Sequence, residues 1–560
     1  SPEPTSGPAA GVQLSWSDPG AWQSGSVPGP RDVAVIDGNM LLDTDAAVAG
    51  VEVRPGGHLT FAPEHSVLLE SSGNVIVHGN LTIVPDGPEI EHVLRFIDID
   101  ESAVVGGGMD PVATDVGLWV VDGGVLHAEG QQRRGWNRTG TDPTWRVGDE
   151  VFVAPMAVGD FAGFAPFTPG SSVPVAKGVG EAIAAEVFNV TRNVRIEGTE
   201  SGRAHVMFSH CTNPQTVRFV AIRHVAPIPQ GGADVSQGLQ HSTGRYGLHF
   251  HHCRDGTRGT VVEGVVVRDC GGHAFVPHAS HGITLRDCVA YTVAADAYWW
   301  DPESSPDSYP SNATHDLVYD HCAAFDLAPT GDHRGFELTG FHLGQGEGNR
   351  CVDCTAAGVR GRVNSSGFHW PSKANGMPNV WDFRDCVAHN NTRHGVFIWQ
   401  NDSADHRLER FRGFRNGGSG VNHGAYLNRY EFEDLALFDN DRCVTSHAGG
   451  RGGQPTRYRG LRATDSLFIA GHPIPFNGPA RFVDCEFPSP IVVNAAIGGR
   501  PSSGGDYEFI DCRADGRPLA ASDFEFVVAP VDTRIHVQNG SEAFEVDGDG
   551  SSRPADPIED

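Results

Sequence analysis

Histidine side chains gather in one short stretch of the chain. His249 and His251 are two residues apart in an extended, apolar segment, so their side chains share one face, whereas His252 points to the other. His278 follows about one repeat later, and stacking in register places it beside His249 or His251. Three imidazoles with a completing carboxylate suit a transition metal such as zinc. A metal-free catalytic role for His251 and simple packing are the alternatives.

Aromatic and acidic side chains follow in the next segment, which reads Tyr298, Trp299, Trp300, Asp301, Pro302 and Glu303. Ring faces stack on the apolar faces of pyranoses, and glycoside hydrolysis needs one acid and one base or nucleophile. We expect Asp301 or Glu303 in one of these roles and Asp255 in the other, with the aromatic residues binding substrate. The alternative places both tryptophans in the core and uses the acids to cap a turn.

Further residues extend this predicted carbohydrate site. Arg245 precedes the histidines, and its guanidinium can fork onto a uronate carboxylate. His369 and Trp370 form a second patch, followed one repeat later by Phe397 and Trp399. These side chains are expected to line a groove, although stacking inside the fold explains them about as well.

A repeated Asp-Cys motif predicts the architecture that positions these residues. Most of the cysteines follow a short apolar strand and a polar residue: Cys270, Cys288, Cys322, Cys354, Cys386, Cys485 and Cys512. Apolar residues alternate at period two between these motifs, which indicates strands. Stacked coils satisfy each strand through its neighbours, so we expect an all-β, right-handed parallel β-helix with a ladder of buried thiols and one or two disulfides at most. An antiparallel sandwich repeat is the rival.

The chain divides by composition into five parts. We expect a linker at 1–13, a glycine-rich β-domain at 14–130, a connecting segment at 131–186, the parallel β-helix at 187–530, and a C-terminal strand and acidic tail at 531–560. Only residues 181–188 have plausible helix chemistry.

The net charge of -29 argues against binding to nucleic acid, which needs a cationic surface. No apolar run is long enough to span a bilayer. The polar start of the sequence resembles a linker left after removal of a leader, so we expect a secreted protein, and we expect a monomer.

Three groups of residues resemble the G8-domain parallel β-helix family. The first runs from Trp16 through Trp22-Gln-Ser-Gly25-Ser-Val-Pro28 and Val33-Ala-Val-Ile-Asp-Gly38 to Phe61. The other two are Thr191-Arg-Asn-Val-Arg-Ile-Glu-Gly198 and Gly244-Arg-Tyr-Gly-Leu-His-Phe-His251. The family includes the cell-migration-inducing and transmembrane hyaluronidases and fibrocystin-like proteins, and the similarity covers roughly residues 14 to 305. Gly247 stands where the family usually has Pro, and a family histidine is replaced in the segment 295–303.

This resemblance implies a G8 domain leading into a parallel β-helix and calcium-assisted cleavage of hyaluronan outside the cell, with no organic cofactor. Together with the residues above, it predicts a secreted polysaccharide-degrading enzyme, a hyaluronidase-like glycoside hydrolase acting on a uronate-containing glycan. The alternatives are a non-catalytic carbohydrate-binding or adhesion protein and a metal-assisted polysaccharide lyase.

Overall fold

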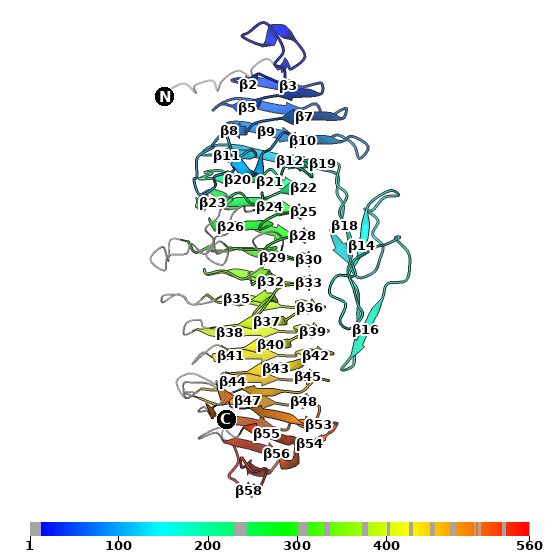
Figure 1. The fold of residues 1–560 in the computed structure, drawn as a ribbon, viewed down its shortest axis with the longest axis vertical. Coiled ribbons are helices and arrows are strands. Elements are labelled where there is room, and N and C mark those ends of the chain that lie inside the picture. Colours follow the sequence, from blue (N-terminus) through cyan, green and yellow to red (C-terminus); the bar gives the residue numbers. More distant parts are fainter. Residues whose placement is uncertain are drawn as a thin grey trace, which may run out of the picture.

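The protein is described by a computed structural model that covers residues 13–228, 243–300, 312–329, 337–371, 379–399, 404–424, 429–447, 454–470, 478–494, 496–497, 500–501, 506–528 and 534–558. Strands dominate these residues, and the helices among them are three-residue 3₁₀ turns. The strands stack one above another along the long axis of the molecule (Figure 1). The predicted all-β parallel β-helix is confirmed.

Three long sheets form the walls of the coil, and they are called here the first, second and third sheets. Within the described residues, the first has 19 strands and the second 16. One coil visits them in turn through β21 (Thr216–Arg218), β22 (Val220–Val225) and β23 (Leu248–Arg254), and the next repeats this order through β24 (Val261–Glu263), β25 (Val266–Cys270) and β26 (Phe275–Ser280). Equivalent strands of successive coils pair in parallel.

The third sheet positions the candidate site and has two parts of seven and eight strands in the described residues. Single bridges join the parts, because Tyr298 pairs with Phe275 on one side and with Phe341 on the other. The first part contains β2 (Val33–Ile36), β5 (Gly50–Val53), β8 (Val75–Val77), β11 (Leu118–Val121), β20 (Val206–Ser209), β23 and β26. The second contains β31 (Thr339–His342), β34 (Ser366–His369), β37 (His394–Ile398), β40 (Ser419–His423), β43 (Arg442–Ser446), β46 (Phe468–Ala470), β49 (Ile491–Asn494) and β55 (Phe524–Val528).

The Asp-Cys repeat marks a recurring corner of the coil. Asp287 lies between β27 (Thr284–Arg286) of the first sheet and β28 (Val289–Val293) of the second, with a φ of 52°. The residues before Cys322, Cys354, Cys386, Cys485 and Cys512 also have positive φ. Aspartate tolerates this left-handed conformation better than most residues, and the following thiol turns inward. All eleven cysteines are buried and free, so the thiol ladder is confirmed and no disulfide forms.

Residues 14–130 supply strands to the same three sheets as residues 187–530, from β1 (Leu14–Ser15) to β12 (Val125–Glu129). Aromatic rings stack inside the coil, as where Tyr298 lies 4.9 Å from Phe275 and 4.3 Å from Phe341 between ring centroids. Beyond residue 530, β56 (Ile535–Asn539) continues the first sheet and pairs antiparallel with β57 (Glu542–Val546).

The connecting segment is a small antiparallel unit beside the coil (Figure 1). It contains β13 (Trp136–Asn137), β14 (Val151–Val153), β15 (Ala165–Pro166), β16 (Val175–Gly178), β17 (Glu181–Ala184) and β18 (Val187–Asn189). The helix expected at 181–188 is therefore wrong, because pairing with β16 and β14 overrides local propensity. Buried Glu186 fastens the unit by contacting Arg138 at 2.7 Å, and Thr355 and His389 of the second sheet at 2.9 and 2.8 Å.

Candidate functional site

Three histidines meet on the outer face of the third sheet. Phe250 of β23 points inward and stacks on Phe208, so His249 and His251 on either side of it point outward. His251 pairs in register with His278 on β26, which confirms the predicted juxtaposition. Each of the three is at most 4% exposed. Gly247 supports this packing, since its N–H donates to the carbonyl of His273 and an added Cβ would lie 2.6 Å from the Ala274 oxygen.

Two of the three separations between the ring nitrogens match those around a tetrahedral cation. Nδ1 of His251 lies 3.3 Å from Nε2 of His249 and 3.2 Å from Nδ1 of His278. Two nitrogens bound to tetrahedral zinc at about 2.05 Å are about 3.3 Å apart. The candidate ligand atoms of all three residues lie within 4.8 Å of one another. Three ligands leave one position of such a cation open.

The protonation of the imidazoles also favours a cation. Burial lowers the pKa of His249, His251 and His278 far below the usual value, and each is lowered further by a neighbouring histidine, so all three are neutral. Nδ1 of His249 is 2.8 Å from the Gly244 carbonyl oxygen and donates to it, which leaves the lone pair of Nε2 facing His251. A single N–H on Nδ1 of His251 then faces two nitrogen atoms, Nε2 of His249 and Nδ1 of His278, and can donate well to only one of them. A cation at this point would accept the lone pairs of all three nitrogens.

The donor set discriminates between the two metals expected. All three donors are imidazole nitrogens, which suit zinc-like transition metals. Calcium takes about six to eight oxygen ligands, and no carboxylate belongs to this group among the described residues. The residues present therefore fit a transition metal and do not fit the calcium implied by the family resemblance.

His252 lies beside the triad rather than on the opposite face. The pairing of β23 with β26 shifts register between His251 and Arg254, and His252 has a φ of 49°. This bulge stacks its ring on that of His251 with centroids 4.2 Å apart. The expectation for His252 was wrong because strict alternation holds only in a regular strand.

Arg245 lies inside the fold and does not face a groove. Its side chain is fully buried with that of Asp115, and Nε donates to the carboxylate at 2.7 Å. Nη1 donates to the Gly108 carbonyl at 2.9 Å, and the guanidinium lies 4.6 Å from the centre of the Trp119 ring. We therefore correct the substrate-binding role expected for Arg245 to a structural one.

The predicted aromatic residues are divided between the core and the outer face. Tyr298 is fully buried and donates its hydroxyl to the carbonyls of Cys288 and Ala323. Trp370 is fully buried and donates to Nδ1 of His406. Both are core residues, which corrects their predicted contact with substrate. Trp299 and Trp300, 7% and 5% exposed, pack in one cluster on the outer side.

Of the predicted acids, Asp255 is exposed and begins the 3₁₀ turn Asp255–Thr257, directly after β23. Its carboxylate contacts Arg258 at 2.7 Å, and this hydrogen bond holds the pKa of Asp255 below its usual value. An ion-paired, solvated carboxylate outside the triad is a poor proton donor. Asp301 and Glu303 lie outside the described residues.

A second titratable group on this side of the coil was missed in the sequence. Oδ2 of fully buried Asp296 lies 3.4 Å from Nδ1 of His342, and Oδ1 accepts the Thr339 N–H at 2.7 Å. The His342 ring stacks on His369 at 4.5 Å, so His369 does lie on the outer face. Burial raises the pKa of Asp296 well above its usual value and lowers the pKa of His342 to about 4. Asp296 belongs to the segment 295–303, where the family histidine is replaced.

The described helices include none long and apolar enough to cross a membrane. No family model matches the sequence, and no curated protein matches it. The resemblance to the G8-domain family thus stays a prediction.

Among solved structures, the chain is distantly similar to two carbohydrate-active enzymes. The A-module of the mannuronan C-5 epimerase AlgE4 from Azotobacter vinelandii matches at 11% identity and a TM-score of 0.29, over 93% of this chain and 88% of that one. A hyperthermoactive exopolygalacturonase from Thermotoga maritima matches at 10% identity and a TM-score of 0.22, over 96% of this chain and 94% of that one.

Proposed function

We propose that the protein is a secreted polysaccharide-degrading enzyme, a hyaluronidase-like glycosidase for a uronate-containing glycan, with a transition-metal centre at His249, His251 and His278. The observation that carries the proposal is the convergence of three neutral imidazoles on the outer face of one sheet, with their candidate ligand atoms within 4.8 Å of one another. A bound cation of this kind supplies a Lewis acid.

The Asp296–His342 pair supplies proton transfer in this proposal. Tyr298 bridges β26 to β31, so His342 lies two strand spacings, about 10 Å, along the sheet from the coil of His278. The His342 side chain is 17% exposed, whereas Asp296 is fully buried behind it. His342 can therefore exchange a proton at the surface while Asp296 holds the ring. Trp399, 44% exposed, adds a ring face for a sugar near His369 and Phe397.

Metal analysis and digestion of size-defined hyaluronan test the proposal. The purified protein is expected to hold one zinc-like ion per chain and to shorten hyaluronan until a chelator removes the ion. His251→Ala is expected to lose both the ion and cleavage, and His127→Ala, an exposed histidine on the first sheet, is the matched control. Asp296→Asn is expected to keep the metal but to lower kcat about 100-fold or more.

The product spectrum separates the reaction classes. Shortened chains without new ultraviolet absorbance indicate hydrolysis. Shortened chains with the absorbance of an unsaturated uronate indicate a lyase reaction instead. If hyaluronan binds but stays intact, the proposed enzymatic activity is refuted and the protein is a binding or adhesion protein. Full cleavage by His251→Ala, or by metal-free protein, removes the metal centre from the mechanism.

A further inference from the structure

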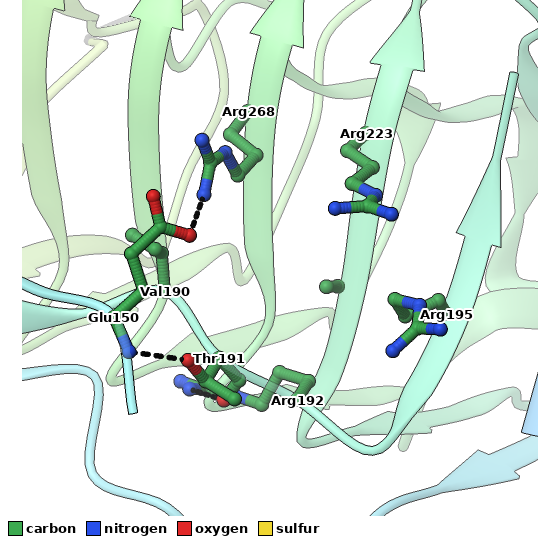
Figure 2. A pocket seen from close by; sticks show the side chains of 8 residues that line it. Glu150, Val190, Thr191, Arg192, Arg195, Arg223 and Arg268 are labelled. Carbon is green, nitrogen blue, oxygen red and sulfur yellow. Dashed lines mark hydrogen bonds and ion pairs between the residues drawn. The ribbon is translucent and has the colours of Figure 1, made fainter. Parts of the chain in front are cut away.

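An arginine-lined hollow lies on the outer side of the second sheet, where the connecting segment meets the coil. It has a volume of about 130 Å³, enough for several water molecules. Its lining includes four arginines and one glutamate: Arg192, Arg195, Arg223, Arg268 and Glu150. Figure 2 shows Arg195, Arg223 and Arg268 around the opening, with Arg192 and Thr191 below them in this view.

The strand register explains both the hollow and its charge. Arg223 on β22 pairs directly with Arg268 on β25, which places two like charges on adjacent strands. Such a pair is unfavourable unless an anion lies near both groups. Ala221 pairs with Arg195 of β19 (Val194–Glu197). Its methyl group leaves open the space that a larger side chain would fill.

The carboxylates around the hollow engage only part of each guanidinium. Nε of Arg223 contacts Glu197 at 2.5 Å, and neither terminal nitrogen of Arg223 has a hydrogen-bond partner among the described residues. Nε of Arg268 donates to Asp269, and Nη1 donates to Glu150 at 2.6 Å. N–H donors on both strands thus stay available to a ligand.

Among the residues that the structure describes, Arg192 adds a buried charge that no carboxylate contacts. It is 2% exposed, and its partners in this part of the chain are the backbone carbonyls of Gly264, Asn189 and Thr191. Its Nη2 is buried and has no hydrogen-bond partner in the described residues. Burial lowers the pKa of Arg192 to about 10, which leaves it charged at neutral pH. A buried cation of this kind is stabilised by an anion nearby.

We propose that this hollow binds one oxyanion group, a carboxylate, sulfate or phosphate, through Arg223 and Arg268. The oxyanion comes either from an acidic glycan or from a free inorganic salt, since both offer the same fork-shaped acceptor. The site lies on a different sheet from the histidine triad and does not depend on the enzyme proposed above.

Isothermal titration of the full chain in chloride buffer tests the site with sodium sulfate, sodium phosphate, a glucuronate-containing oligosaccharide and a neutral oligosaccharide of equal length. Ala221→Leu fills the hollow and removes no charge, and Arg223→Gln removes one donor group. Each is expected to raise Kd about tenfold or more. Arg534→Gln, which breaks the exposed pair with Asp506 elsewhere on the coil, is expected to change nothing.

The ligands separate the two sources. Binding of the acidic oligosaccharide well below the concentrations needed for sulfate and phosphate supports a glycan, and binding of the inorganic ions alone supports a free anion. The proposal is overturned if no acidic ligand binds at about 10 mM, if the neutral oligosaccharide binds equally well, or if both variants bind as the parent does. Thermal midpoints of the variants confirm that each one folds.

Discussion

Replacing Arg245 with methionine distinguishes a structural arginine from a substrate-binding one. The side chain is buried against Trp119 and pairs with Asp115, whose carboxylate also accepts the N–H groups of Val105 and Gly106 at 2.8 and 2.9 Å. Methionine keeps much of the buried hydrocarbon but removes the positive charge. Asp115 would then be a buried carboxylate without a cation.

The expected cost follows from these contacts. Removing one partner of a buried ion pair costs about 3 to 5 kcal/mol, because the other charge is left uncompensated. Asp115 retains its two backbone donors and the hydroxyl of Thr114, which still stabilise the anion. We therefore expect the free energy of unfolding to fall by an amount near the lower end of this range, about 3 kcal/mol.

Urea unfolding measures this loss, and hydrogen exchange locates it. Hydrogen exchange is expected to accelerate at the amides of Val105 and Gly106, because both donate to the Asp115 carboxylate, which is no longer held in place by Arg245. Arg258→Met is the matched control, since it removes two exposed ion pairs, with Asp255 and Asp316, and is expected to cost far less than the loss of the buried pair. Unchanged stability of the Arg245 variant, with weaker glycan binding, would refute the structural role and restore the substrate contact.

Two further predictions concern stability and thiols. Burial raises the pKa of Glu186, but Arg138 and His389 outweigh it and lower the pKa far below the unfolded value. Glu186 thus stabilises the fold above about pH 4.3 and loses this contribution as pH falls toward its folded pKa, so urea midpoints should drop in acid less steeply for Glu186→Gln. A thiol reagent is expected to modify none of the eleven cysteines in the native protein and all eleven in guanidinium, and rapid native labelling would contradict their burial.

The sequence predicted those parts of the site that depend on regular strand geometry. His249 and His251 share a face because they are two residues apart, and the repeat length brings His278 beside His251. The Asp-Cys motif indicated the coil because aspartate accepts the left-handed corner that each turn requires.

Other parts of the site depend on contacts that spacing alone does not encode. Asp296 and His342 belong to successive coils and are 46 residues apart in the sequence, so no short motif joins them. The bulge after His251 turns His252 toward the triad. Arg245 sits in the motif that suggested a substrate contact, but its partner Asp115 is far away in the sequence.

The register of one strand pairing determines which of the predicted aromatic side chains point inward and which point outward. Tyr298 bridges Phe275 and Phe341, whose rings stack inside the coil, and this pairing fixes Tyr298 as inward and Trp299 as outward. The same alternation turns Phe368 inward, His369 outward and Trp370 inward. A slip by one residue would exchange the two faces, turning Tyr298 and Trp370 to the outer face and Trp299 and His369 to the interior of the coil. The rings of Trp299 and His369 therefore lie on the outer face because the stack of aromatic rings inside the coil determines which residues of these strands point inward.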